Sequence, residues 1–598
     1  MDLSDYKTGT PTRGGQDENA VPTSSRNRFR VLGRLRPRLP AMLPFDKEQP
    51  HKRKRKKLAA FYDVHEQPIL MLAFLLSLQH YMTVQSLTVL QPKVLSEFLC
   101  TDADNPAIGL LVGSASFISG IGTLVQTTAG VRLPVIQSGA LATSSPALAE
   151  LKFDHIPCPA NSTLDDGVWV TRLLEVQAGT AVAAFTEVFM GGLGVVGVFQ
   201  RWITPLTMTP AIALIGLSNI SAATQPASTS WTIAAITAAL ITLLSHYLTP
   251  CHPSSEMAAV KKLNDCITFF SILPIFVTVA IVWLVCHFLT MHDLFPQDHA
   301  GRTDQMTSLI SNTTWFRVPP PFQWGTPAAG WESMVAMAFV SLITMMETVC
   351  DYYAYAVVAG LPPPPPRAIN RGIFIEGLGC LLAGCFGTGV LCGSQDLNLG
   401  LIALTRCASL RVVQMAAVIM IVFGLITKES VFMLSIPTPI VGGLLLVLLS
   451  VLAGVGLAHL RYVDLTSSRN VFIVGVSLAS GIVLPMHVGP ACEFAITQVH
   501  VIDRVIYAFF SSGSVIGGFV GCLLDHTIPG TEEERGILKM RECFDEAGAR
   551  AMLARDPLRH WQYYSVPCFE KLLRKFPALR KLPVMPEREP HVSYVEDE

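Results

Sequence analysis

The amino-acid sequence predicts an all-α polytopic membrane protein with 14 transmembrane segments. Half of the 598 residues are apolar and only 15% are charged, whereas an ordinary soluble chain carries roughly 25% charged residues. Most of the charge lies in the two ends of the chain, so residues 65–524 hold only 17 basic and 24 acidic side chains. A surface this poor in charge is not soluble in water. This excludes a soluble enzyme, a disordered scaffold and a nucleic-acid-binding protein.

The predicted spans are apolar stretches of about 20 residues, the length that crosses a bilayer. Nine stretches are continuous: 68–90, 107–127, 178–198, 229–249, 266–290, 333–358, 411–427, 470–486 and 504–524. Five more are interrupted, near 131–149, 203–221, 374–408 (two segments) and 431–458. We expect Pro205 and Pro210 to break the fifth span, and Pro437 and Pro439 to break the twelfth.

The interrupted segments recur in the same order in the two halves of the chain. A short third span would pair with a short tenth, and a proline-broken fifth with a proline-broken twelfth. Such matching interruptions are typical of transporters built from inverted repeats, here seven plus seven spans. Chance is the alternative explanation, because glycine and proline are common in membrane helices.

Charge and glycosylation sequons predict that both termini are cytoplasmic. The two tails together hold 27 of the 44 basic residues, which favours the cytoplasmic side for both. The sequons at Asn161 and Asn312 then fall outside, as N-glycosylation requires. Cys100 and Cys158 also fall outside, where they either form a disulfide or remain two free thiols. The 14 cysteines show no spacing typical of a metal site.

The eighth span carries the clearest candidate for a solute or cation site. Glu347 and Asp351 are four residues apart, so a helix places both carboxylates on one face. Ionisable side chains inside a membrane cost roughly 3 kcal/mol or more and are therefore functional candidates. Two such acids repel each other unless a cation or a shared proton lies between them, which indicates a cation-coupled solute site. The alternative is a helix-end cap or an interhelical hydrogen bond, above all for Asp351.

The tenth segment is a second candidate because polar residues interrupt it at 393–400. Irregular backbone at membrane depth survives only where protein or a water-filled cavity satisfies it. A half-helix that begins near Asn398 would direct its positive N-terminus at this gap. Such a gap favours an anionic or acceptor-rich ligand.

Four other polar residues in the spans are weaker candidates. Gln79 and His80 of the first span are further site candidates, and for His80 the alternative is a structural hydrogen bond. We expect Glu187 of the fourth span to pair across helices. We expect Glu376 to be an acid at the N-terminus of the ninth span, where it would complement the helix dipole.

Several blocks of sequence resemble one transporter family. They are LQHYMT at 78–83, QTTAGVRLPVIQ at 126–137, ETVCDYYAYAVVAGLPPPPPRAINRGIFIEG at 347–377, SSRNVFIVG at 467–475 and PGTEEERG at 529–536. On these blocks the chain is identified as a member of the nucleobase–ascorbate transporter family, solute carrier family 23. Within it, the chain most resembles the animal sodium-dependent vitamin C transporters. The resemblance covers about residues 60–536.

The resemblance implies a uracil-permease-like fold with a core domain and a gate domain. The implied layout is a basic cytoplasmic N-terminal tail at 1–64, core at 65–200 and 333–427, gate at 201–290 and 428–524, an extracellular loop at 291–332 and a cytoplasmic C-terminal tail at 525–598. It also implies a homodimer in the plasma membrane, in which an elevator-type movement of the core carries the solute across the bilayer.

The resemblance further implies a site between the third and tenth spans, each of which contributes a short strand. Glu347 stands where the family keeps its substrate-binding acid, and Asp351 where the vitamin C branch has an acid associated with sodium. His80 matches a first-span histidine beside the site. The other expected site residues are Gly139, Ala140, Leu141, Ser394, Gln395, Leu397 and Asn398 for the solute, and Asp396 for the cation.

Three positions depart from the family pattern. Leu397 stands where nucleobase members have Gln or Glu and ascorbate members have Pro, although Asn398 and the residues after it fit the signature. Residues 390–392 are apolar or weakly polar, where vitamin C transporters are rich in Gly, Asn and Ser. Leu141 replaces an aromatic residue that usually faces the solute, which weakens a flat ligand by about 1 kcal/mol. These departures leave the fold prediction unchanged and weaken the substrate prediction.

The sequence therefore predicts a sodium-coupled symporter that takes up ascorbate or a related planar solute, with sodium as the co-transported ion and no other cofactor. Asp396 would repel an anionic solute unless a cation neutralised it, which favours cation coupling or a neutral solute. A nucleobase permease coupled to sodium or protons is the alternative within transport. A non-transporting relative that serves as a scaffold is the alternative of a different class.

Overall fold

The computed structural model describes residues 62–101, 105–139, 166–248, 267–389, 391–487, 499–543, 563–566 and 573–586, with single positions at 497 and 569. All of them belong to one compact unit, Leu58–Glu598. Most of the predicted N-terminal tail, together with Ala140, Leu141, Cys158 and Asn161, lies outside the described residues.

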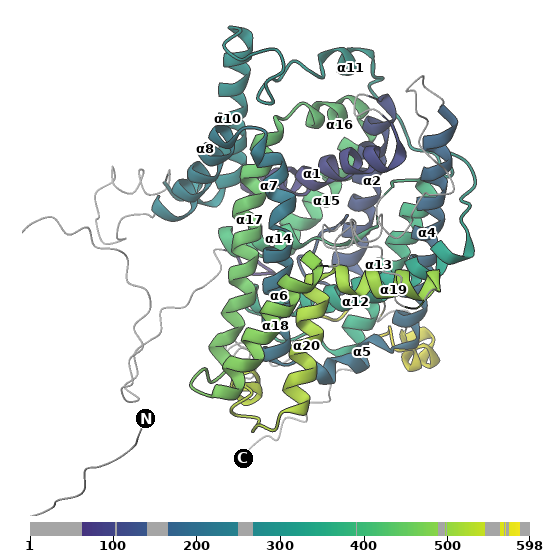
Figure 1. Cartoon of the computed structure of the whole chain (residues 1–598), viewed down its shortest axis with the longest axis vertical. Coiled ribbons are helices and arrows are strands. Elements are labelled where there is room, and N and C mark those ends of the chain that lie inside the picture. The colour runs from purple at the N-terminus through teal and green to yellow at the C-terminus, as the bar shows by residue number, and fades with distance from the viewer. Residues whose placement is uncertain are drawn as a thin grey trace, which may run out of the picture. The chain divides into compact units, whose positions relative to one another are not determined.

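Helices form most of the described chain (Figure 1). Their bounds are α1 (Leu70–Leu99), α2 (Pro106–Thr128), α4 (Asp166–Leu193), α5 (Val196–Phe199), α6 (Pro205–Ser218), α7 (Ile220–Ser228), α8 (Trp231–Thr242), α10 (Pro274–Met291), α11 (Thr307–Asn312), α12 (Trp331–Val358), α13 (Pro366–Phe386), α14 (Asp396–Thr405), α15 (Leu410–Leu425), α16 (Thr427–Leu434), α17 (Thr438–Ala458), α18 (Ser468–His487), α19 (His500–Ser511) and α20 (Gly513–Thr527). Two short strands, β1 (Gln137–Ser138) and β2 (Gly393–Ser394), pair with each other.

Nine helices of the described residues are long and apolar enough to cross a membrane, and up to eleven spans result if each bent helix pair counts as one. This confirms a multi-pass membrane protein. The number of 14 spans and the seven-plus-seven inverted repeat stay predictions.

The two prolines expected to break the fifth span have other positions in the structure. Pro205 begins α6 rather than breaking it, because Thr204 caps the helix and a proline at the first position loses no helical hydrogen bond. Pro210 lies inside the same helix, so the expected break at this residue is wrong. Membrane helices tolerate such a proline because neighbouring groups satisfy the freed backbone.

The span predicted to be continuous over 504–524 is bent by 84° between α19 and α20. At the bend, a Cβ atom on Gly513 would lie 2.4 Å from the backbone oxygen of Gly481 in α18. Only glycine allows this close approach of two backbones, and the hydropathy of the segment gives no sign of it.

Two sets of helices pack mainly within themselves. The first set comprises α1, α2, α4, α12, α13, α14 and α15, in which α13 packs along α4 and α15 along α2. The second set comprises α6, α7, α8, α17, α18 and α20, in which α6 packs against both α17 and α20. The sets meet where α14 packs against α17 and where α12 packs against α6 and α20. Helix α19, which belongs to neither set, also packs against α12. The bounds of the implied core and gate domains stay a prediction.

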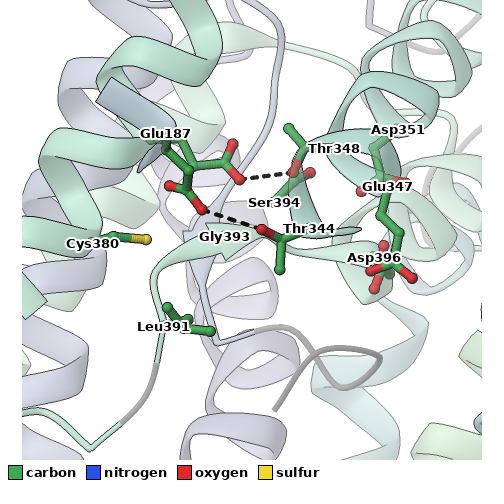
Figure 2. A pocket seen from close by; sticks show the side chains of 11 residues that line it. Glu187, Thr344, Glu347, Thr348, Asp351, Cys380, Leu391, Gly393, Ser394 and Asp396 are labelled. Carbon is green, nitrogen blue, oxygen red and sulfur yellow. Dashed lines mark hydrogen bonds between the residues drawn. The ribbon is translucent and has the colours of Figure 1, made fainter. Parts of the chain in front are cut away.

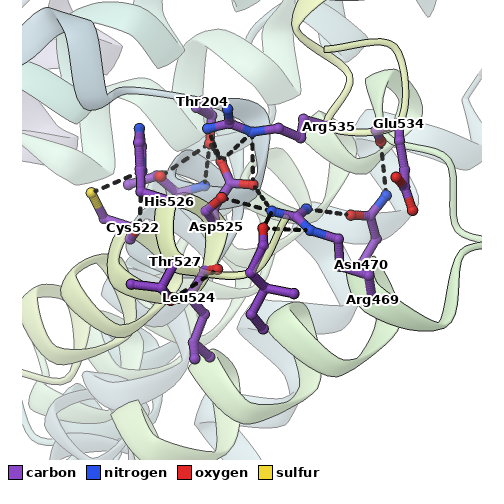
Figure 3. A network of polar contacts seen from close by, with 12 residues as sticks. Thr204, Arg469, Asn470, Cys522, Leu524, Asp525, His526, Thr527, Glu534 and Arg535 are labelled. Atoms are coloured by element: carbon purple, nitrogen blue, oxygen red, sulfur yellow. Dashed lines mark hydrogen bonds and ion pairs between the residues drawn. The ribbon is translucent and has the colours of Figure 1, made fainter. Parts of the chain in front are cut away.

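The segment after the last helix folds back onto the second set through a buried acid (Figure 3). Asp525 in α20 is completely buried, and its carboxylate binds Arg469 at 2.9 Å and Arg535 at 2.8 Å. The hydroxyl of Thr204 donates to the same carboxylate at 2.9 Å. Asp525 is the first residue of the predicted tail, but α20 continues to Thr527. The beginning of this tail is therefore part of the packed helices.

A later piece of the predicted tail contacts the first set. The guanidinium of Arg371 in α13 donates to the backbone oxygen of Tyr564 at 2.7 Å, and Arg132 donates to that of Ser565. The Tyr564 hydroxyl donates to the backbone oxygen of Pro362 at 2.7 Å. The C-terminal region thus contacts both sets of helices.

Replacing Asp525 with Ala is expected to destabilise the protein by about 3–5 kcal/mol, because two largely buried guanidinium groups lose their partner. The shift in thermal unfolding of the purified protein in detergent measures this loss. The control is Asp304→Ala in an exposed loop, where Arg302 bonds to Asp304 at 2.6 Å and lowers the pKa of that carboxyl. Equal shifts for the two variants would contradict the prediction, because exposed ion pairs contribute little.

Candidate functional site

The strand pair β1–β2 lies at the centre of the candidate site. The strands are antiparallel, with Gln137 opposite Ser394 and Ser138 opposite Gly393. The backbone N–H of Gln395 extends the pairing by donating to the oxygen of Ile136 at 3.0 Å. The irregular third and tenth segments therefore satisfy each other's backbone groups, as membrane depth requires. Gly139 follows β1 directly, and α14 begins at Asp396, two residues before the expected Asn398.

A small pocket opens beside β2 (Figure 2). Its lining residues are Glu187, Thr344, Glu347, Thr348, Asp351, Glu376, Cys380, Leu391, Gly393, Ser394 and Asp396. Five of these eleven residues are carboxylic acids, each at least nine-tenths buried. None of the eleven, all within the described chain, is Lys, Arg or His. Protons or cations must therefore balance the negative charge of this pocket.

Helix α12 presents two polar stripes to the pocket. Glu347 and Asp351 form an acidic stripe, and both line the pocket, as their four-residue spacing on one helix face predicts. Thr344, Thr348 and Tyr352 form a hydroxyl stripe, in which each residue is one turn from the next. One helix thus supplies both the acids and several of the hydroxyl donors.

Glu347 accepts hydrogen bonds from two residues that the sequence analysis missed. The Ser512 hydroxyl donates to Oε1 of Glu347 at 3.0 Å, and the Ser514 hydroxyl donates to the same atom. These serines flank the bend between α19 and α20. The run of small residues at 511–514 was the available signal, but it lies inside a stretch that reads as one continuous span.

Asp351 and Asp396 are neighbours on the same side of the pocket as Glu347 (Figure 2). Their carboxyl groups interact directly, and Oδ1 of Asp351 has no hydrogen-bond partner among the described residues. Two adjacent carboxylates repel each other unless a proton or a cation intervenes. The pair has the oxygen donors that a hard monovalent cation prefers.

Glu187 and Glu376 form a second acid pair in the pocket. The Thr344 hydroxyl donates a hydrogen bond to Glu187 at 3.2 Å. Glu376 accepts hydrogen bonds from the hydroxyls of Thr348 at 2.7 Å and Tyr352 at 3.1 Å. The cross-helix pairing expected of Glu187 is confirmed. The expectation that Glu376 opens its helix is wrong, because α13 already begins at Pro366, the last residue of the run of prolines.

The pairing of Glu187 with Glu376 depends on close contact between α4 and α13. A Cβ atom on Gly377 would lie 2.7 Å from the backbone nitrogen of Val188. The glycine therefore lets the two helices approach, and it brings both acids to one side of the strand pair.

The remaining predicted residues surround the strands. His80 Nδ1 lies 2.6 Å from Oδ1 of Asn398, whose amide donates to the oxygen of Pro134 at 2.9 Å. Gln395 is completely buried, and both its side-chain oxygen and nitrogen lack hydrogen-bond partners among the described residues. Leu397 is also buried, in the apolar core.

Gln79 contacts the start of α10 rather than the pocket. Its amide donates to the oxygen of Ile272 at 3.2 Å and accepts from the N–H of Ile275 at 3.2 Å. Gln79 is therefore not one of the residues that line the pocket.

Two predicted features of the loops lie partly within the described chain. Asn312 is exposed at the end of α11. Cys100 is disulfide-bonded, and the residue expected to pair with it, Cys158, lies outside the described residues. Glycosylation at Asn161 and Asn312 stays a prediction.

Replacing Glu376 with Gln is expected to destabilise the protein by about 1–3 kcal/mol, because the new amide turns a donor toward hydroxyl groups that already donate. The Tyr352 oxygen already accepts a hydrogen bond from the amide of Gln126 at 2.5 Å, so its O–H group is left to donate. Glu187→Gln is the matched control and should cost less, because among the described residues one hydroxyl, that of Thr344, and the weaker Cys380 thiol donate to Glu187. Thermal unfolding of both variants measures the difference, and an equal or larger loss for Glu187→Gln would contradict it.

Comparisons with known proteins identify the family of the chain. A model described as a permease family matches residues 71–489. Solute carrier family 23 member 2 of Homo sapiens is 36% identical, over 88% of this chain and 82% of that protein. Solute carrier family 23 member 1 of Rattus norvegicus is 35% identical, over 89% of each chain. Nucleobase-ascorbate transporter 1 of Arabidopsis thaliana is 30% identical, over 77% of this chain and 88% of that protein. Because these matches cover most of the chain, the protein belongs to solute carrier family 23 and is a membrane transporter.

Proposed function

We propose that this transporter couples the entry of sodium to the uptake of ascorbate or a related planar solute through the pocket beside the strand pair. The observation that carries the proposal is the pocket itself, in which five buried carboxylic acids meet no basic side chain among its lining residues. Such a pocket needs protons or cations for charge balance, and an entering cation would supply it. Its relatives include proteins named for nucleobase and ascorbate transport, which supplies the class of solute.

Different acids would bind the solute and the cation. Glu347 would accept hydrogen bonds from solute hydroxyl or ring N–H groups, and Asp351 with Asp396 would hold the cation. The buried amide of Gln395, which has no partner among the described residues, would bind a polar edge of the solute. Ser394 and the backbone at 139–141 and 397–398 would complete the site.

Cation coupling also answers the energetic problem of an anionic solute. Ascorbate is a monoanion at neutral pH, so a negative membrane potential inside the cell opposes its entry. Each sodium ion that enters with it contributes about 2.3 kcal/mol per 100 mV. We place the transporter in the plasma membrane as a homodimer with cytoplasmic termini, and the first helix set would move past the second in an elevator-type cycle.

A neutral nucleobase is the second candidate solute. One observation favours it: the amide of Gln395 offers a donor and an acceptor side by side. A purine or pyrimidine carries the complementary donor and acceptor on one edge. A neutral solute would also avoid repulsion from Asp396.

Uptake of labelled ascorbate into expressing cells, with sodium present or replaced by choline, tests the proposal. We expect sodium-dependent uptake that excess uracil or xanthine does not reduce. Glu347→Gln should abolish uptake while surface expression is retained. Entry of labelled nucleobase without entry of ascorbate would support the second candidate. No uptake of either solute, despite surface expression, would indicate a non-transporting relative.

Asp396→Asn tests the cation role separately. Loss of one charged ligand should raise the sodium concentration for half-maximal uptake about tenfold or more, because hydrogen bonds and contacts to charged groups are worth about 1.5–3 kcal/mol. The control, Asp304→Asn, makes the same chemical change in an exposed loop and should leave the sodium dependence unchanged. Unchanged sodium dependence in Asp396→Asn would refute the assignment.

A further inference from the structure

We propose that Ser512 and Ser514 form a serine latch on Glu347, which ties the two helix sets together until solute takes their place. This inference rests on the proposed solute role of Glu347. It adds two residues of the second helix set that control how readily the pocket accepts solute.

The contacts of the serine latch are close and buried. Ser512 and Ser514 are 4% and 3% exposed, and Glu347 is 9% exposed. Both hydroxyls donate to Oε1 of Glu347, and they lie 2.9 Å from each other. In this conformation, the two serines thus occupy one of the two oxygens that Glu347 can offer to a solute.

The bend between α19 and α20 holds the serines in place. Ser512 lies at the bend and Ser514 in the first turn of α20, on either side of Gly513. The backbone of Gly513 lies against the backbone of α18, where no side chain fits. The hydroxyls are therefore positioned by packed backbone of the second helix set, and they do not depend on long, mobile side chains.

Glu347 belongs to the other set of helices. It lies on α12, which packs against α4 and α14 within the first set. The serine latch is therefore a contact between the two sets that passes through a residue proposed to bind solute. Oε1 cannot accept hydrogen bonds equally well from two serine hydroxyls and from a solute donor. Binding of solute therefore weakens the contact between the sets.

This competition links occupancy of the pocket to movement. A ligand shifts a conformational equilibrium only by the difference in its affinity for the two states. Here the difference has a structural source, since one state places the serine hydroxyls on Glu347 and the other leaves its oxygen to the solute. Without solute, the latch favours the conformation in which the two sets are joined.

The test is a double variant, Ser512→Ala with Ser514→Ala, compared with wild type in sodium-driven uptake. The matched control is Ser511→Ala, because the Ser511 hydroxyl donates to the oxygen of Ala508 in its own helix at 2.9 Å. We expect kcat/KM to rise about three- to tenfold in the double variant, because Glu347 no longer gives up serine partners when solute binds. The control should match wild type, and Ser512→Thr with Ser514→Thr should restore the wild-type value.

Two results would overturn the latch. A fall in kcat/KM would make the serines ligands of the solute, and an unchanged value would make them packing residues. If the wild-type chain carried neither ascorbate nor nucleobase, the proposed function would fail, and hydrogen–deuterium exchange would still decide on the latch. The latch predicts faster exchange in the double variant both at 344–351 of α12 and at 512–516 of α20, and unchanged exchange on α12 refutes it.

Discussion

The burial of five carboxylic acids around one small pocket is the constraint on which the rest of the site depends. Unpaired buried charge costs several kcal/mol per ion, so every element near the pocket supplies something to offset it. Helix α12 contributes the hydroxyls of Thr344, Thr348 and Tyr352. The bend before α20 contributes Ser512 and Ser514. None of these donors is a cation, so full compensation depends on what enters the pocket.

The strand pair explains how such a pocket can exist at membrane depth. Two segments that cannot continue as helices satisfy each other through β1 and β2, at the cost of ending their helices early. Asn398 connects this region to α1 through His80 and to the β1 side through the oxygen of Pro134. The result is a rigid, irregular centre from which backbone groups as well as side chains can reach a solute.

The sequence predicted the parts of this site that depend on local spacing. Glu347 and Asp351 follow from a four-residue interval, and the polar interruption at 393–400 follows from composition. The positions it missed depend on tertiary contact. The bend at Gly513 results from an approach to α18, which no hydropathy window detects. Glu376 was misplaced because the end of a proline run, rather than the first acid, determines where α13 begins. Gln79 could be assigned only once α10 was seen to begin beside it.

The two stripes of α12 also fix the rotation of this helix about its own axis. The acidic stripe and the hydroxyl stripe face different partners. The two stripes are separated by only one residue step around the helix axis, with acids at 347 and 351 and hydroxyls at 344, 348 and 352. Inserting one residue ahead of them would turn the whole pattern by about 100° relative to everything packed before it. The acids would then take the places of Thr348 and Tyr352 beside Glu376, although the composition and hydropathy of the span would hardly change. The length of α12, counted from the residue that anchors its start, is therefore as strictly constrained as the identity of its acids.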